Sequence, residues 1–94
     1  MRVIKKEPGR PAEVVEIEND LKPLQDAIGG WIETFTLPIG LCVICDEEGL
    51  LKRLPYNTFI AGNHFVGPIL IVGVDGEDFT DVPEKYVTLL LQAL

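Results

Sequence analysis

The sequence predicts an α+β fold, a single small domain with about five antiparallel or mixed strands and two helices packed on the sheet. Its 94 residues leave room for one hydrophobic core, so we treat residues 1–94 as one domain. Short β-branched or alternating segments between Pro- and Gly-containing turns indicate the strands, and apolar residues at helical spacing indicate the helices.

A β-hairpin is predicted at the start of the chain. Residues 2–6 and 13–18 have strand patterns, and Pro8 followed by Gly9 suits a type II turn between them.

The next predicted element is a short helix that covers the sheet. Asn19 or Asp20 can cap its beginning, and Gly29-Gly30 supplies a left-handed stop. The apolar residues at helical spacing are Leu21, Leu24 and Ile28.

Three further strands and a second helix complete the predicted fold. Residues 31–37 and 41–46 suit a second hairpin through Pro38-Ile39-Gly40, and residues 50–65 are expected to be irregular. The continuous β-branched and Leu run at 69–74 predicts a strand buried on both faces, at the centre of the sheet.

The second helix is predicted from about Val82 to Leu91 or beyond. Asp81 and Glu84 have the spacing of a capping box, and Pro83 fits a first helical turn.

The charge balance argues against nucleic-acid binding. Acids outnumber bases by 15 to 8, and the formal net charge is −7. Because Lys and Arg supply most of the affinity for phosphate backbones, we expect no nucleic acid as a partner. The charge is uneven, since the first ten residues carry +3 and the other 84 carry −10.

The apolar segments are too short to span a membrane, so we expect no membrane as a partner. No segment reaches the roughly 18 apolar residues of a transmembrane helix, and the first residues lack the apolar region of a signal peptide. We therefore expect a cytoplasmic protein with free thiols.

Three motifs give the chain a family resemblance. They are Leu21-x-x-Leu24-Gln25-x-x-Ile28-Gly29-Gly30-Trp31-Ile32-Glu33, Cys45-Asp46-Glu47-Glu48-Gly49-x-Leu51-x-x-Leu54-Pro55-x-Asn57 and Gly67-x-x-x-Ile71-x-Gly73. The chain resembles the domain-of-unknown-function family numbered thirty-eight forty-six, small proteins of Gram-positive bacteria, phages and mobile elements. The resemblance implies no activity and no catalytic residues, and Gly67-Pro68 departs from the Gly-Thr more usual in the family.

Cys42 and Cys45 have the spacing of a zinc or redox motif but lie in a predicted strand. Positions i and i+3 of a strand point to opposite faces, so the two thiols should not converge on one ion. We interpret both as core cysteines and expect no metal and no cofactor. The alternative is a small hydrolase or redox enzyme that uses Cys42, Cys45 or His64.

Five carboxylates lie within ten residues near the end of the chain. They are Asp75, Glu77, Asp78, Asp81 and Glu84. A solvated turn with favourable charge at a helix N-terminus explains them, and a docking patch for a basic partner is the alternative.

The segment Lys52–Asn57 is the best candidate for a contact surface. Lys52, Arg53, Tyr56 and Asn57 combine two cations, an aromatic ring and an amide within an acidic chain. The competing interpretation is a solvated turn that Asn57 caps.

The last nine residues are unusually apolar for a surface helix. Four of them, Val87, Leu90, Leu91 and Leu94, can fill the core. Tyr86, Leu89 and Ala93 are then candidates for a subunit interface, which predicts a homodimer unless the helix is buried all round.

The sequence therefore favours a non-enzymatic binding or protein-interaction module, accessory to a phage or mobile element, that contacts a host protein or a small ligand. Besides the enzyme, a further alternative is an acidic nucleic-acid mimic. That alternative requires carboxylates along one continuous face.

Overall fold

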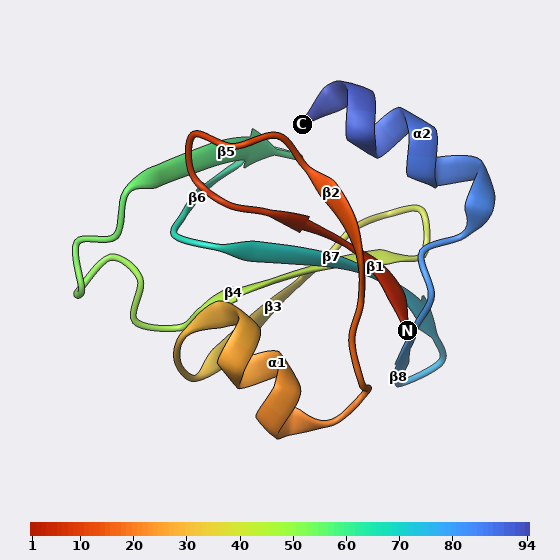
Figure 1. Ribbon diagram of the computed structural model, residues 1–94, viewed down its shortest axis with the longest axis horizontal. Coiled ribbons are helices and arrows are strands. Elements are labelled where there is room, and N and C mark those ends of the chain that lie inside the picture. Colours follow the sequence, from red (N-terminus) through yellow and green to blue (C-terminus); the bar gives the residue numbers. More distant parts are fainter.

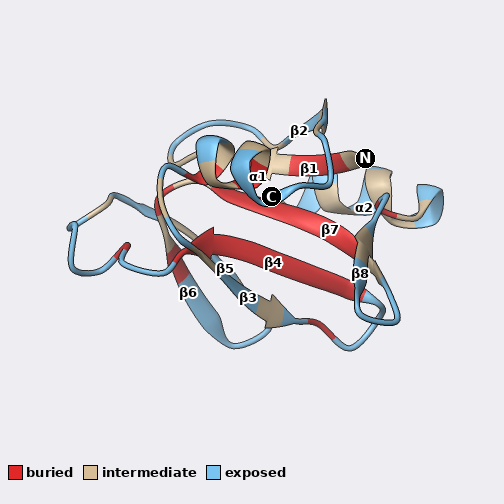
Figure 2. Cartoon of the chain, turned by 90° about the horizontal axis from the view of Figure 1, so that it is seen from below, coloured by how far each residue is buried: buried red, intermediate tan, exposed pale blue.

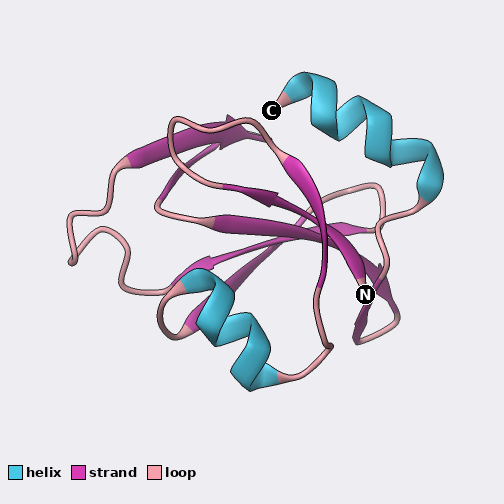
Figure 3. Cartoon of the chain, in the orientation of Figure 1, coloured by secondary structure: helices cyan, strands magenta, loops and turns pink.

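The computed structural model describes residues 1–94 and contains eight strands and two helices (Figure 1). The strands are β1 (Arg2–Lys6), β2 (Glu13–Glu16), β3 (Ile32–Thr36), β4 (Leu41–Asp46), β5 (Tyr56–Ile60), β6 (Asn63–Val66), β7 (Ile69–Asp75) and β8 (Asp78–Thr80), and the helices are α1 (Leu21–Ile28) and α2 (Glu84–Ala93). The predicted α+β class is confirmed, although the number of strands exceeds the expected five (Figure 3).

Six of the strands form one antiparallel sheet. Its order is β2-β1-β7-β4-β3, and β8 pairs with the end of β7. The predicted central strand is confirmed, because β7 lies between β1 and β4. Figure 2 shows β4 and β7 as the most continuously buried strands.

The sheet buries apolar side chains on both faces, and the two helices lie on opposite faces (Figure 1). One face packs Val3, Cys42, Ile44, Leu70 and Val72 against Leu24 and Ile28 of α1. The other packs Ile4, Val43, Cys45, Ile69 and Ile71 against Phe65 of β6 and against Val87 and Leu90 of α2. The fold therefore has three layers, and the second face shares its cover between α2 and the β5–β6 hairpin.

The predicted turn and helix end are found at glycines with positive φ. Gly9 has φ 71°, and the Arg10 N–H donates to the Glu7 carbonyl across the turn. Gly29 ends α1 in the left-handed conformation with φ 92°. Leu21 was expected among the packed residues of α1 but is exposed, because only Leu24 and Ile28 reach the sheet.

The predicted capping box at α2 is wrong. The Oδ1 atom of Asp81 accepts the backbone N–H of Arg2, at 2.7 Å, and Pro83 occupies the N-cap position without a side-chain bond. The segment before α2 also runs directly against β7, since a Cβ atom at Gly73 would collide with the Asp81 carbonyl oxygen. This close crossing carries the chain from β8 to the face that α2 covers.

The helix α2 packs with one side only. Tyr86, Val87, Leu90 and Leu94 contact the core, whereas Leu91 is exposed, contrary to expectation. No residue of α2 is fully buried, so the helix is not buried all round. Neither helix of the fold has the length and apolar character needed to cross a membrane.

The expectation of an irregular segment at 50–65 is wrong for its second half. Residues 56–66 form the β5–β6 hairpin, whose two-residue turn is Ala61-Gly62. Both turn residues have positive φ, 49° and 85°, as a type I′ turn requires.

Candidate functional site

A loop projects from one end of the main sheet, and the β5–β6 hairpin that follows it runs back over the sheet (Figure 1). The loop follows β4 at residues 47–55, and the β5–β6 hairpin follows the loop; we call residues 47–66 the loop–hairpin unit. On its inner side, Ile60 and Phe65 pack onto the core. Phe65 also meets Phe35 of β3 edge to face, with ring centroids 5.2 Å apart.

The loop is ordered by its own backbone hydrogen bonds. Gly49 donates to the Asp46 carbonyl at 3.1 Å, and Lys52 donates to the Glu48 carbonyl at 2.9 Å. Leu54 donates back to the Gly49 carbonyl at 3.1 Å. The chain therefore folds into consecutive turns here.

An ion pair between Asp46 and Lys52 fixes the loop to the end of β4. The Asp46 side chain is only 1% exposed, and its Oδ2 atom lies 2.7 Å from the Lys52 ammonium. Its Oδ1 atom accepts the Glu48 N–H at 2.8 Å. A Cβ atom at Gly30 would come within 2.6 Å of the Lys52 ammonium, so this pair lies directly against the backbone of Gly30.

These bonds outweigh the effect of burial on the pKa of Asp46. Burial raises the pKa of a carboxyl group, but the hydrogen bond from Lys52, the backbone N–H of Glu48 and the Lys52 charge lower it further. The net pKa of Asp46 is below its ordinary 3.8, so the carboxylate is ionised at neutral pH.

The far end of the loop is held by Leu54 and Asn57. The Leu54 side chain fills the space beside Gly67, where a Cβ atom would come within 2.5 Å of it. The Asn57 amide donates to the Lys6 carbonyl at 2.8 Å and to the Gly67 carbonyl at 2.7 Å. These contacts join β5 to the end of β1 and to the link between β6 and β7.

The outer side of the unit exposes large apolar side chains. Leu50 and Leu51 are each 82% exposed, and Tyr56 and Phe59 are each 55% exposed. His64 lies next to both the leucines and the aromatic rings. It lines one cleft with Leu50 and Leu51. Its ring centroid lies 4.8 Å from that of Phe59, and its Nδ1 atom is 3.0 Å from the Tyr56 hydroxyl oxygen. We call Leu50, Leu51, Arg53, Tyr56 and Phe59 the outer surface of the unit.

The four contact residues predicted from the sequence divide into two pairs. Lys52 and Asn57 bond to parts of the chain outside the unit and shape the unit. Arg53 and Tyr56 lie on its exposed side, where the Tyr56 side chain bonds only to His64 of the same hairpin. Sequence reasoning missed Leu50 and Leu51, although two adjacent leucines in a turn-rich segment are a readable signal for an exposed apolar site.

The structure separates the two cysteines and brings Cys45 near His64. Cys42 faces α1, and Cys45 lies on the other face, as predicted. Cys45 lines the same cleft as His64, but burial, with the charges of Glu33 and Asp46, raises its pKa to about 11. A thiol of this pKa is protonated at neutral pH and is a poor nucleophile.

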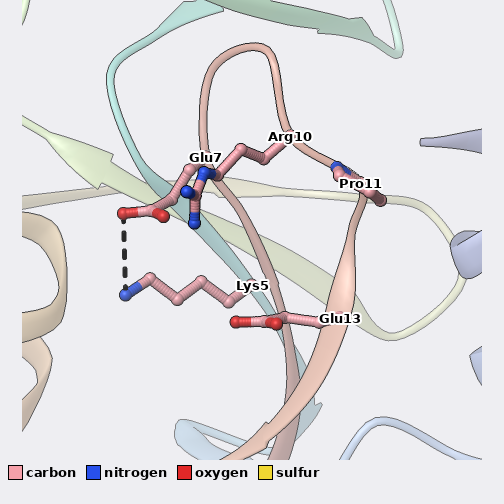
Figure 4. Close-up of a pocket in the computed structure, with 5 residues that line it drawn as sticks. All are labelled: Lys5, Glu7, Arg10, Pro11 and Glu13. Carbon is pink, nitrogen blue, oxygen red and sulfur yellow. Dashed lines mark ion pairs between the residues drawn. The ribbon is translucent and has the colours of Figure 1, made fainter.

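Three of the four cations at the start of the chain, all except Arg10, are paired or bonded within the chain. Arg2 pairs with Glu84, and Lys6 is buried with its ammonium on the Glu7 carbonyl. An open hollow of about 520 Å³ lies at the β1–β2 turn, and the Lys5 ammonium lies 4.0 Å from the Glu7 carboxylate beside it. Figure 4 shows the side chains that line this hollow. Glu13 lies beside Lys5 in the same view, so carboxylates accompany the cations of this hollow.

The three candidate interface residues of α2 also differ from one another. Leu89 is 57% exposed and Ala93 is exposed, so both are accessible to a second chain. Tyr86 is half-buried and packs against the core of its own chain.

The Asp46–Lys52 pair predicts an acid-sensitive stability. Because its folded pKa is lowered, ionised Asp46 stabilises the fold above pH 3.8, and this contribution is lost as the pH falls through the folded value. Asp46→Asn should lower the free energy of unfolding by about 1 to 3 kcal/mol at neutral pH. In urea titrations, the variant should also lose stability less steeply than the natural chain below about pH 4.

The matched control is Asp26→Asn, which breaks the exposed pair with Lys22 on α1. It should cost a few tenths of a kcal/mol, as exposed helical pairs do. Equal costs for the two variants would contradict the structural role of Asp46.

The comparisons with known proteins agree with the resemblance noted in the sequence. No curated protein and no solved structure matches the chain. One family model, described as Domain of unknown function (DUF3846), matches residues 1–94. The chain therefore belongs to the DUF3846 family.

Proposed function

We propose that this chain is a protein-interaction module that docks on a partner protein through the outer surface of the loop–hairpin unit. The observation that carries the proposal is the 82% exposure of Leu50 and Leu51 on a loop fixed at both ends. Exposed apolar groups gain free energy when a partner removes them from water, and an ordered loop loses little conformational entropy on binding. Both properties are typical of a preformed docking surface.

The shape of the surface favours a protein over a small ligand. Small-molecule sites are enclosed cavities that bury most of the ligand. Here the leucines lie on the projecting loop and the aromatic rings on the exposed side of the hairpin, and the neighbouring cleft of about 370 Å³ is open to solvent. A partner surface can cover such a projection, whereas a small molecule would bury little of it.

The alternatives have less support. A cysteine enzyme needs a reactive thiolate, and burial raises the pKa values of Cys42 and Cys45. An acidic mimic needs carboxylates on one face, but Glu13 and Glu33 lie on strands at opposite edges of the sheet, and Asp46 is paired with Lys52. The association with a phage or mobile element stays a prediction from the resemblance.

Self-association through α2 also stays a prediction. The exposure of Leu89 and Ala93 supports it, because residues four apart share one side of a helix. Light scattering at micromolar concentration should give the dimer mass, and Leu89→Asp should give the monomer mass. A monomer mass for the natural chain excludes the interface.

The docking proposal predicts that capture of a partner depends on the two leucines. We expect the natural chain, cross-linked in a lysate of its own host, to capture a defined protein that the Leu50→Ser/Leu51→Ser variant loses at least tenfold. The variant should fold normally, because both side chains are mostly in water. Quantitative mass spectrometry of the cross-linked products makes the comparison.

Leu21→Ser is the matched control, since Leu21 is an exposed leucine on α1, at the other face of the sheet. It should capture the same protein as the natural chain. Equal capture by the loop variant, or equal loss in the control, would refute the proposed surface.

A further inference from the structure

The strand β3 is an edge of the main sheet, with β4 as its only neighbour. The Trp31 carbonyl accepts the Glu47 N–H, and the Leu37 N–H donates to the Leu41 carbonyl. Antiparallel hydrogen bonds alternate along a strand, so the peptide groups of residues 31, 33, 35 and 37 face β4. Those of Ile32, Thr34 and Thr36 therefore face away from the sheet.

The two long edges of the sheet differ in how they are protected. β2 carries a charged residue at each end, Glu13 and Glu16, and closely follows Pro11. Charges and proline protect edges from pairing with another chain. β3 has one charge, Glu33, followed by Thr-Phe-Thr, which has high strand propensity.

An apolar cleft lies beside this edge. Its volume is about 370 Å³, and its apolar lining includes Phe35, Phe65, Val66, Leu50 and Leu51. Glu33 and Phe35 both line it, so the cleft is on the face that the side chains of residues 33 and 35 share. A strand added along β3 would therefore place every second side chain on the cleft face.

The rim of the cleft is acidic. Glu33, Asp46 and Glu47 line it, and no Lys or Arg does. Lys52 neutralises Asp46, which leaves Glu33 and Glu47 available to an incoming chain. A second copy of this chain, with net charge −7, is a poor match for that rim, whereas a basic segment is a good one.

From this juxtaposition we propose that β3 binds an extended segment of a partner protein as an added strand. The segment carries an apolar side chain beside Phe35 and a Lys or Arg two residues away, beside Glu33. Backbone hydrogen bonds to Ile32, Thr34 and Thr36 provide the pairing, and the cleft selects the side chains. This inference rests on the proposed function and names the chemistry of the partner that reaches the loop–hairpin unit.

The probe for the test is a fluorescein-labelled peptide of about ten residues. Leucine and lysine alternate along one face of its extended form, and threonine occupies the other face. Binding is measured by fluorescence anisotropy at low salt, and we expect saturable binding at micromolar concentrations. The same peptide with N-methyl groups along one backbone edge, or with glutamate in place of lysine, should bind at least tenfold more weakly.

Substitutions at two residues, Thr34 and Glu33, test the same contacts from the protein side. Thr34→Pro removes an outward N–H without breaking a bond to β4, so it should weaken binding of the probe at least tenfold. Thr34→Ala keeps that N–H and should bind the probe as the natural chain does. Glu33→Lys should lower the affinity for the lysine peptide and raise the affinity for the glutamate peptide. If Thr34→Pro does not fold, the N-methylated peptides decide alone.

The remaining outcomes separate the two proposals. Strand addition is overturned if the natural chain does not bind the probe, or if the N-methylated peptides bind as tightly as the parent. It is also overturned if the natural chain is a dimer that Thr34→Pro converts to a monomer, because a second copy then covers the edge. If the probe binds normally but Leu50→Ser/Leu51→Ser captures every partner of the natural chain, the loop–hairpin proposal fails instead.

Discussion

The whole structure depends on a sheet whose central strands are apolar on both faces. Ile69, Leu70, Ile71 and Val72 are consecutive and fully buried, so each side of β7 must be covered by another element. A 94-residue chain has few elements for this purpose. α1 covers one face, while α2 and the β5–β6 hairpin share the other. The inner side of the β5–β6 hairpin is therefore needed to complete the core, whatever its outer side contacts.

This dual role explains how the chain can keep apolar groups in water. The inner side of the loop–hairpin unit is held by Phe65 in the core, by the Asp46–Lys52 pair and by the bonds of Asn57. With the unit fixed in this way, Leu50 and Leu51 stay in water at a defined position on the surface. The loop–hairpin unit has an apolar outer side, and the unpaired edge of β3 lies next to it. Together they offer two contact surfaces to one partner.

Much of the fold could be predicted from the sequence because its strongest signals are local. The Pro8-Gly9 turn, the Gly29 helix stop and the 69–74 run each depend on near neighbours, and all three are found in the structure. The β5–β6 hairpin was missed because Ala61 has no preference for the positive φ that it adopts. The candidate site was predictable only in part: the residue types of Lys52 and Asn57 suit contact with a partner, but their bonds to Asp46, Lys6 and Gly67 are long-range and have no local pattern.

Docking through Leu50 and Leu51 requires that the loop hold a single conformation in the free protein, which amide hydrogen exchange can measure. The informative amides are those of Lys52 and Leu54, which donate to the carbonyls of Glu48 and Gly49. Both amides should exchange at least about a hundredfold more slowly than in an unstructured peptide. Exchange of both amides at the unstructured rate, with β7 fully protected, would show that the leucines lie on a mobile loop and would contradict the account.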